Sequence, residues 1–170
     1  MSTRIRIGIS SCLLGERVRY DGGHKHSEII TATLGKEFDF VPFCPEVAIG
    51  LGVPRPPVRL VQDAHGVRVC GITDSTCDVT DRLAAYAEKV APELHDVSGY
   101  IFKAGSPSCG MQGVSVFGTE GALVATGAGI YAATLMRLLP ELPFEDEARL
   151  MDPALRESFI ARVLGYHRSR

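Results

Sequence analysis

The sequence predicts a single α/β domain in which helices cover both faces of a mostly parallel central sheet. Strand-like and helix-like hydrophobic periods alternate along the 170 residues, an order typical of parallel sheets. The composition, 45% hydrophobic and 22% charged, is that of a globular unit large enough to bury a core. Several strand-like runs end in loops rich in Gly and Pro, where such folds carry their chemistry.

The first two core strands are expected in the first half of the chain. Residues 4–9 alternate Arg and Ile before a glycine, the two-residue period of a strand with one buried face. Ser27 is a plausible N-cap for a short helix, and Gly35 is its predicted stop. Residues 38–43 form the second predicted strand, and the glycines and prolines of residues 50–57 argue against a helix there.

The middle of the chain continues the alternation of strands and helices. Short β-branched runs at 58–61 and 67–72, split by a turn, predict a hairpin or an edge pair. A helical period begins at Val79, and Pro92 should end or kink that helix. Residues 99–102 are the third predicted core strand.

Helices dominate the predicted C-terminal part. After a fourth core strand at 114–117, residues 127–129 lead into a helix that Pro140 stops. The last helix is expected to begin at Asp152 and Pro153, an N-cap followed by proline at the first helical position. We therefore expect residues 1–170 to form one domain whose helical tail covers about 127–170.

Charge and hydropathy exclude several classes of function. The formal net charge is −2, so the molecule has no basic field of the kind that binds DNA. No apolar run approaches the ~20 residues of a membrane span. Residues 1–6 lead into a strand instead of the apolar core of a signal peptide. We expect a cytoplasmic protein with no membrane partner.

Three of the five cysteines follow strand-like runs. Cys12, Cys44 and Cys109 come after the first, second and third predicted core strands. Because loops after adjacent parallel strands gather at one edge of a sheet, we expect these thiols to form a shared site. Cys70 and Cys77 lack this placement, and we interpret them as core or incidental thiols.

The thiols by themselves allow three kinds of site. A 4Fe-4S cluster on three cysteines leaves one iron without a protein ligand, open to bind substrate as a Lewis acid. In a non-catalytic zinc-binding interaction module, His24 or His26 would complete a Cys3His site. A thiol enzyme would use Cys109 as nucleophile, activated by Lys103 or a histidine.

Polar side chains surround the predicted thiol site. Glu46 lies two residues after Cys44, close enough for general acid/base chemistry on a ligand held by the thiols. By itself, however, this position is equally typical of an exposed glutamate that caps the next turn, and the residues alone favour that interpretation. Ser106 and Ser108 flank a proline, and either hydroxyl could hydrogen-bond a ligand or cap the loop itself. The cations suited to a phosphate, if the substrate is a nucleotide, are Lys25, Arg55 and Lys103.

Five short motifs, taken in order, resemble the thiouracil desulfidase family; they are residues 11–15, 18–25, 44–46, 50–55 and 103–110. The match runs from about residue 5 to at least 117. This resemblance implies a 4Fe-4S cluster on Cys12, Cys44 and Cys109, whose open iron takes the sulfur of a thiolated uracil and leaves the oxygen analogue and sulfide. It further implies Glu46 as the acid/base residue and Ser106 as a hydroxyl that positions the substrate.

The resemblance also bears on the substrate. Residues 127–170 resemble the end of this domain in longer relatives that carry a second domain and act on thiolated uridine in tRNA. Because that second domain is absent here, we expect a small thiolated pyrimidine (2- or 4-thiouracil, or 4-thiouridine and its nucleotides) instead of tRNA. The substrate-binding residues expected in that case are Tyr20, Asp21, Gly22, His24, Lys25, Arg55, Lys103 and Ser108.

Overall fold

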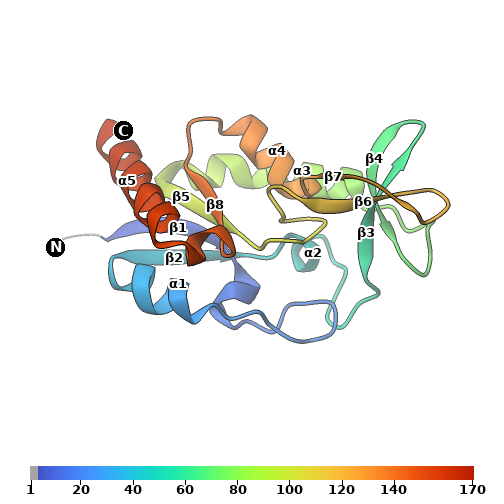
Figure 1. Cartoon of the computed structure of the whole chain (residues 1–170), viewed down its shortest axis with the longest axis horizontal. Helices are drawn as coiled ribbons and strands as arrows, with labels where there is room; N and C mark the ends of the chain where they lie inside the picture. The colour runs from blue at the N-terminus through green and yellow to red at the C-terminus, as the bar shows by residue number, and fades with distance from the viewer. Residues whose placement is uncertain (1–3) are drawn as a thin grey trace.

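The computed structural model describes residues 4–170 as two four-stranded sheets with helices packed around them (Figure 1). Sheet A is entirely parallel, in the order β2 (Phe38–Phe43), β1 (Ile5–Ser10), β5 (Val97–Phe102) and β8 (Phe144–Asp146). Sheet B is mixed, in the order β4 (Gly66–Gly71), β3 (Val58–Asp63), β6 (Val114–Gly118) and β7 (Leu123–Gly127). Residues 1–3 lie outside the described residues; they belong to the stretch, residues 1–6, that was predicted to lead into the first strand.

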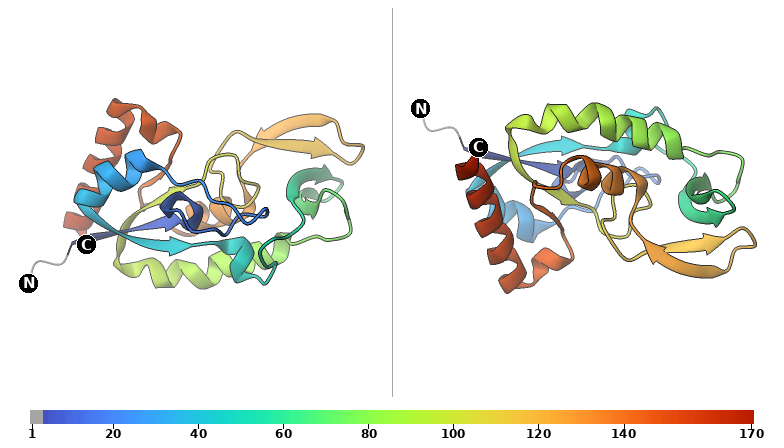
Figure 2. Two further views of the ribbon diagram at one scale, coloured as in Figure 1. Left: turned by 90° about the horizontal axis from the view of Figure 1, so that it is seen from below. Right: turned by 90° about the horizontal axis from the view of Figure 1, so that it is seen from above.

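Helices cover both faces of sheet A, as predicted. On one face, α1 (Glu28–Thr33) and α5 (Pro153–Ser169) pack their apolar side chains against β1. On the other face, α3 (Thr80–Glu93) and α4 (Ile130–Leu138) pack against β5. Figure 2 shows α3 and α5 on opposite sides of the sheet. Within residues 4–170, no helix is long and apolar enough to cross a membrane.

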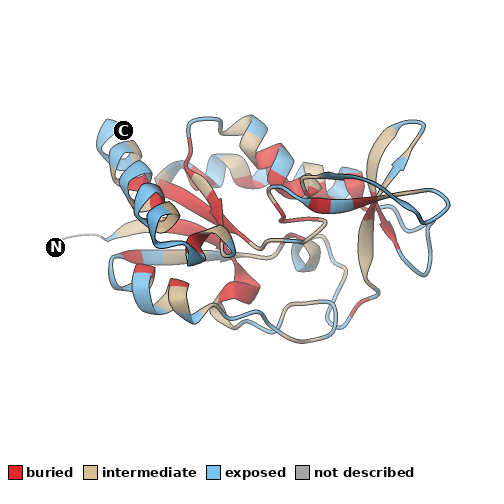
Figure 3. Cartoon of the chain, viewed as in Figure 1, coloured by how far each residue is buried: buried red, intermediate tan, exposed pale blue. Residues whose placement is uncertain are grey.

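The centre of sheet A is the most deeply buried part of the fold. All six residues of β5 are buried (Figure 3). In the neighbouring β1, Gly8 faces the ring of Tyr100, and a Cβ there would lie 2.5 Å from Tyr100 Cδ2. Glycine at this position therefore lets the ring of a central residue pack directly on the strand.

Two strand predictions need correction. Residues 114–117 were expected in the central sheet but pair with β3 in sheet B. The fourth strand of sheet A is β8, which lies inside the segment predicted as a helical tail. Its sequence gives no apolar period, because its buried residues include Glu145 and Asp146. Arg149 Nε, 2.7 Å from Glu145 Oε1, supplies one of the ion pairs that allow this acidic strand to be buried.

Local boundaries were predicted more closely. The hairpin of β3 and β4, the helix that starts after Val79 and the capped start of α5 are all present. Gly35 does not stop α1, because a 3-10 turn over Leu34–Lys36 follows the helix directly. A short helix, α2 (Pro45–Ala48), replaces the loop expected after Cys44. Pro92 lies in the last turn of α3, which ends one residue later.

Candidate functional site

A cavity of about 430 Å³ lies between the carboxyl ends of the sheet A strands and the nearest part of sheet B. The ends of β1, β2 and β5 supply one wall, through Ser10, Phe43 and Lys103. Pro57 and Val58, at the start of β3, supply another. The loops that leave three adjacent parallel strands therefore open into one cavity, which is the arrangement expected of a ligand site in this kind of sheet.

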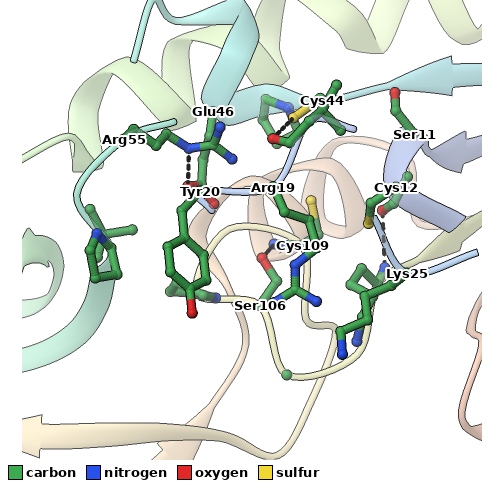
Figure 4. Close-up of a pocket in the computed structure, with 18 of the residues that line it drawn as sticks. Ser11, Cys12, Arg19, Tyr20, Lys25, Cys44, Glu46, Arg55, Ser106 and Cys109 are labelled. Carbon is green, nitrogen blue, oxygen red and sulfur yellow. Dashed lines mark hydrogen bonds and ion pairs between the residues drawn. The ribbon is translucent and has the colours of Figure 1, made fainter. Parts of the chain in front are cut away.

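All three predicted thiols line this cavity (Figure 4). Cys12 lies in the 3-10 turn Ser11–Leu14 after β1, and Cys44 is the N-cap residue of α2 after β2. Cys109 lies in the loop after β5. Cys12 and Cys109 are buried, whereas Cys44 is partly exposed. Among residues 4–170, no three His, Cys, Asp or Glu side chains converge closely enough to hold a single metal ion.

Burial keeps these thiols protonated when they carry no metal. It raises the pKa of Cys12 to about 11 and raises the pKa values of Cys44 and Cys109 above the usual value for a thiol. A nucleophilic cysteine needs the opposite shift, because the thiolate is the reactive form. A metal or cluster would instead displace the protons and hold the thiolates. The surroundings of Cys109 thus weigh against its use as a nucleophile.

Glu46 enters the cavity from α2, and its carboxylate is held at both oxygens. Arg55 Nε donates to Oε1 at 3.1 Å and Ser108 Oγ donates to Oε2 at 2.9 Å. Arg55 is itself fixed, since its Nη1 donates to the carbonyl of Gly52 at 2.9 Å. Only 14% of the Glu46 side chain is exposed. The carboxylate is therefore held in one orientation at the cavity wall.

Ser106 presents a hydroxyl whose acceptor capacity is already used. Its Oγ accepts from the backbone N–H of Ser108 at 3.1 Å and from that of Cys109 at 3.0 Å. A serine hydroxyl has one proton and two lone pairs. Because both lone pairs face the backbone, the proton is left to be donated to a group in the cavity that Ser106 lines.

The loop that carries Ser106 and Cys109 is docked on the start of α4. The N–H of Ile130 donates to the carbonyl of Pro107 at 3.1 Å, and that of Ala132 donates to the carbonyl of Ser108 at 3.0 Å. The loop carbonyls thus take up donors that the first turn of a helix leaves without partners inside the helix.

Cationic side chains border the cavity on the side of Cys12. Lys25 and Arg19 reach it from the loop between β1 and α1, and Lys103 reaches it from the end of β5. Lys103 Nζ lies 2.8 Å from Glu147 Oε1. Tyr20, 41% exposed, also lines the cavity, and the Arg19 guanidinium carbon lies 5.9 Å from the centre of its ring. An anionic ligand group on the side of Cys12 would meet several positive charges.

Four of the predicted substrate-binding residues do not line the cavity. Asp21 and His24 are exposed and serve their own loop: Asp21 Oδ1 accepts from the N–H of Gly23 at 2.8 Å, and His24 Nδ1 accepts from that of His26 at 3.1 Å. Gly22 occupies a turn position with φ of 79°. Ser108 is completely buried behind Glu46.

The lining also includes residues that the sequence analysis did not select. Arg19 could have been chosen on the same grounds as Lys25, as a cation in a polar loop. The apolar contributors Pro57, Val58 and Ile72 gave no sequence signal, because their role depends on where sheet B lies. None of the residues that line the cavity in the described part of the chain is a histidine, so the Cys3His zinc site finds no fourth ligand there.

Three comparisons with known proteins give related matches. Residues 7–147 match the model of the family described as 2-thiouracil desulfurase. A Bacillus subtilis (strain 168) protein, YbbK, is 35% identical over 133 residues, which cover 75% of this chain and 87% of that protein. A solved structure titled as the 4Fe-4S-dependent thiouracil desulfidase TudS is similar, with a TM-score of 0.63 and 30% identity over 91% of this chain and 99% of the other.

Proposed function

Because the chain belongs to the 2-thiouracil desulfurase family, we propose that it is a 4Fe-4S-dependent desulfidase. Its substrate is a thiolated uracil, and its products are the oxygen analogue and sulfide. The observation that carries this proposal is the meeting, in one cavity, of three buried or partly buried thiols and a fixed carboxylate.

The donor set fits a cluster with three protein ligands. Cys12, Cys44 and Cys109 come from three separate loops and line a single cavity without converging on one point. Iron-sulfur clusters accept such dispersed thiolates, whereas a structural zinc ion needs four closely placed ligands. When bound, the cluster would supply a Lewis-acidic iron without a protein ligand, which would be available to a thiocarbonyl sulfur.

The remaining chemistry is assigned to the side chains of this chain. Replacement of C=S by C=O consumes one water and releases hydrogen sulfide, so no oxidant or reductant is needed. Glu46 takes a proton from the attacking water and returns it to the departing sulfur or the ring. Ser106 donates its hydroxyl proton to an acceptor atom of the pyrimidine and so fixes the orientation of the ring.

The rim suggests how the rest of the substrate is held. A cavity of about 430 Å³ falls within the range typical of small-molecule sites. Tyr20, Lys25 and Arg19 line the cavity, and we assign the Tyr20 ring to cover the base and the two cations to contact a phosphate. We therefore keep a thiolated base, nucleoside or nucleotide as the substrate class. Since both sheets line the cavity, we also propose that residues 1–170 work as one domain.

Anaerobic reconstitution tests the proposal. A brown protein with iron and acid-labile sulfide that releases sulfide from 2-thiouracil, 4-thiouracil or 4-thiouridine would support it. A colourless protein with stoichiometric zinc and no sulfide release would refute it in favour of the interaction module. If alkylation abolishes activity while iron removal does not, the reaction belongs to a thiol enzyme.

A further inference from the structure

The Glu46 carboxylate receives its two hydrogen bonds from segments that are distant in sequence. Ser108, which donates to Oε2, follows β5, whereas Arg55, which donates to Oε1, precedes β3. Ser108 is 0% exposed, and the Arg55 side chain is only 5% exposed. Hydrogen bonds to a charged group at such sites are among the stronger ones in proteins.

Each hydrogen-bonding group of Ser108 already has a partner within the protein. Its hydroxyl proton goes to Glu46, its N–H goes to Ser106 Oγ, and its carbonyl accepts from the N–H of Ala132. The residue is also shielded from the cavity. The prediction from sequence that Ser108 binds substrate therefore does not account for its contacts.

We propose that Ser108 and Arg55 are positioning residues that hold Glu46, and that the bond from Ser108 to Glu46 also fixes the Cys44 and Cys109 loops relative to each other. Glu46 lies two residues after Cys44, and Ser108 lies one residue before Cys109. A single hydrogen bond thus joins the two loops that carry these thiols. The first part rests on the proposed function of Glu46, whereas the joining of the loops does not depend on any reaction.

Arg55 extends the same arrangement to the rim. Its backbone N–H donates to the carbonyl of Tyr20 at 2.8 Å, and its Nη1 donates to the carbonyl of Gly52. Arg55 therefore connects three segments: its guanidinium joins the carboxylate to Gly52, and its backbone joins them to the loop that carries Tyr20. A lysine has no planar fork and cannot make both side-chain contacts with the same geometry.

A double-mutant cycle tests the assignment on the reconstituted enzyme. The variants are Ser108→Ala, Glu46→Gln and the double variant, and the matched control is Ser115→Ala, an exposed serine on β6. We expect Ser108→Ala to lower kcat roughly tenfold or more, the factor associated with loss of a hydrogen bond to a charged group, with KM changed less than about twofold. In the Glu46→Gln background the same change should cause no further fall, because Ser108 acts through Glu46.

A second readout needs no turnover. We expect a chelator to bleach the visible absorbance of iron-loaded Ser108→Ala protein several times faster than that of wild type and Ser115→Ala, because this variant lacks the hydrogen bond that joins the two loops. If Ser108→Ala does not fold, as judged by circular dichroism, Arg55→Lys takes its place in the cycle, with the same non-additive loss of kcat expected. Should wild type release no sulfide, the proposed reaction fails, while the bleaching rates still report on the loops.

Three outcomes would overturn the inference. A rise in KM with unchanged kcat would make Ser108 a substrate contact. Additive losses in the double variant would show that it acts independently of Glu46. Wild-type bleaching rates in Ser108→Ala would show that the hydrogen bond does not hold the loops together.

Discussion

Substitution of Gly129 by alanine should displace the loop that carries Ser108 and Cys109 into the cavity. Gly129 precedes α4 and faces the loop that carries Ser108 and Cys109. A Cβ at this position would lie 2.5 Å from the carbonyl carbon of Ser108 and 2.6 Å from its oxygen. With φ of −62° and ψ of 151°, the backbone itself is open to any residue, so the cost is steric and falls on the neighbouring main chain.

The size of the effect follows from that contact. To reach an ordinary separation of about 3.4 Å, the Ser108 backbone and Gly129 must move apart by about 0.9 Å. Forced movement of this kind in a packed interior typically costs about 1–3 kcal/mol of stability. A displacement of about 1 Å in a catalytic constellation can lower a rate by about two orders of magnitude. We therefore expect Gly129→Ala to lose about 1–3 kcal/mol of stability and to release sulfide about two orders of magnitude more slowly.

Urea unfolding and single-turnover sulfide release measure the two effects. Gly127→Ala is the matched control, because a Cβ there would lie 3.7 Å from Val116 Cγ2, an ordinary contact. The reasoning is wrong if Gly129→Ala keeps wild-type stability and full sulfide release. It is equally wrong if Gly127→Ala loses as much activity as Gly129→Ala.

Three further predictions concern the thiols. Cys12→Ala should lower iron and acid-labile sulfide content and abolish sulfide release, whereas Cys70→Ala should leave both near wild type; equal loss in the two variants would refute the ligand assignment. Iodoacetamide mapping by mass spectrometry should label exposed Cys77 in every state but label Cys44 only after iron is removed, and labelling of Cys44 in loaded protein would contradict its role as a ligand. Burial raises the pKa of the Cys12 thiol from 9.0 to about 11. Above about pH 9 the unfolded chain therefore loses this proton while the folded protein keeps it, so the free energy of unfolding falls as the pH rises from 9 toward 11. In urea titrations, metal-free wild type should accordingly lose about 3 kcal/mol more stability than Cys12→Ala between pH 9 and pH 11. Equal losses in the two proteins would show that the pKa of Cys12 is not raised.

The sequence carried enough information to place the thiols. Cys12 and Cys44 each follow a run whose hydrophobic period predicts a strand. Because the loops after adjacent parallel strands gather at one edge of the sheet, these two thiols were expected in the same place, and both line the cavity. The prediction needed only local periods and one topological rule, so it did not depend on knowing how the rest of the chain packs.

Sheet B and β8 lay beyond that kind of reasoning. The buried part of β8 is acidic, and its burial depends on arginines that come later in the chain, such as Arg149. The β6 strand has an ordinary strand pattern, but nothing in residues 114–117 distinguishes pairing with β3 from pairing with β5. The contributions of Ile72 to the cavity and of Ser108 to Glu46 depend on contacts between distant segments, which a single sequence does not reveal.

The two sheets contribute different things to the cavity. The loops after sheet A supply the thiols and the hydroxyl of Ser106, and the strand before Ser106 and Cys109, β5, is buried along its whole length. Pro57, Val58 and Ile72, in and beside the strands of sheet B, supply apolar contacts. Glu46 stands between them, because it follows a strand of sheet A and is held by Arg55 from the segment that leads into sheet B. Residues on the sheet B side can therefore change the fit of a substrate without moving the thiols, while the position of Glu46 depends on both sides.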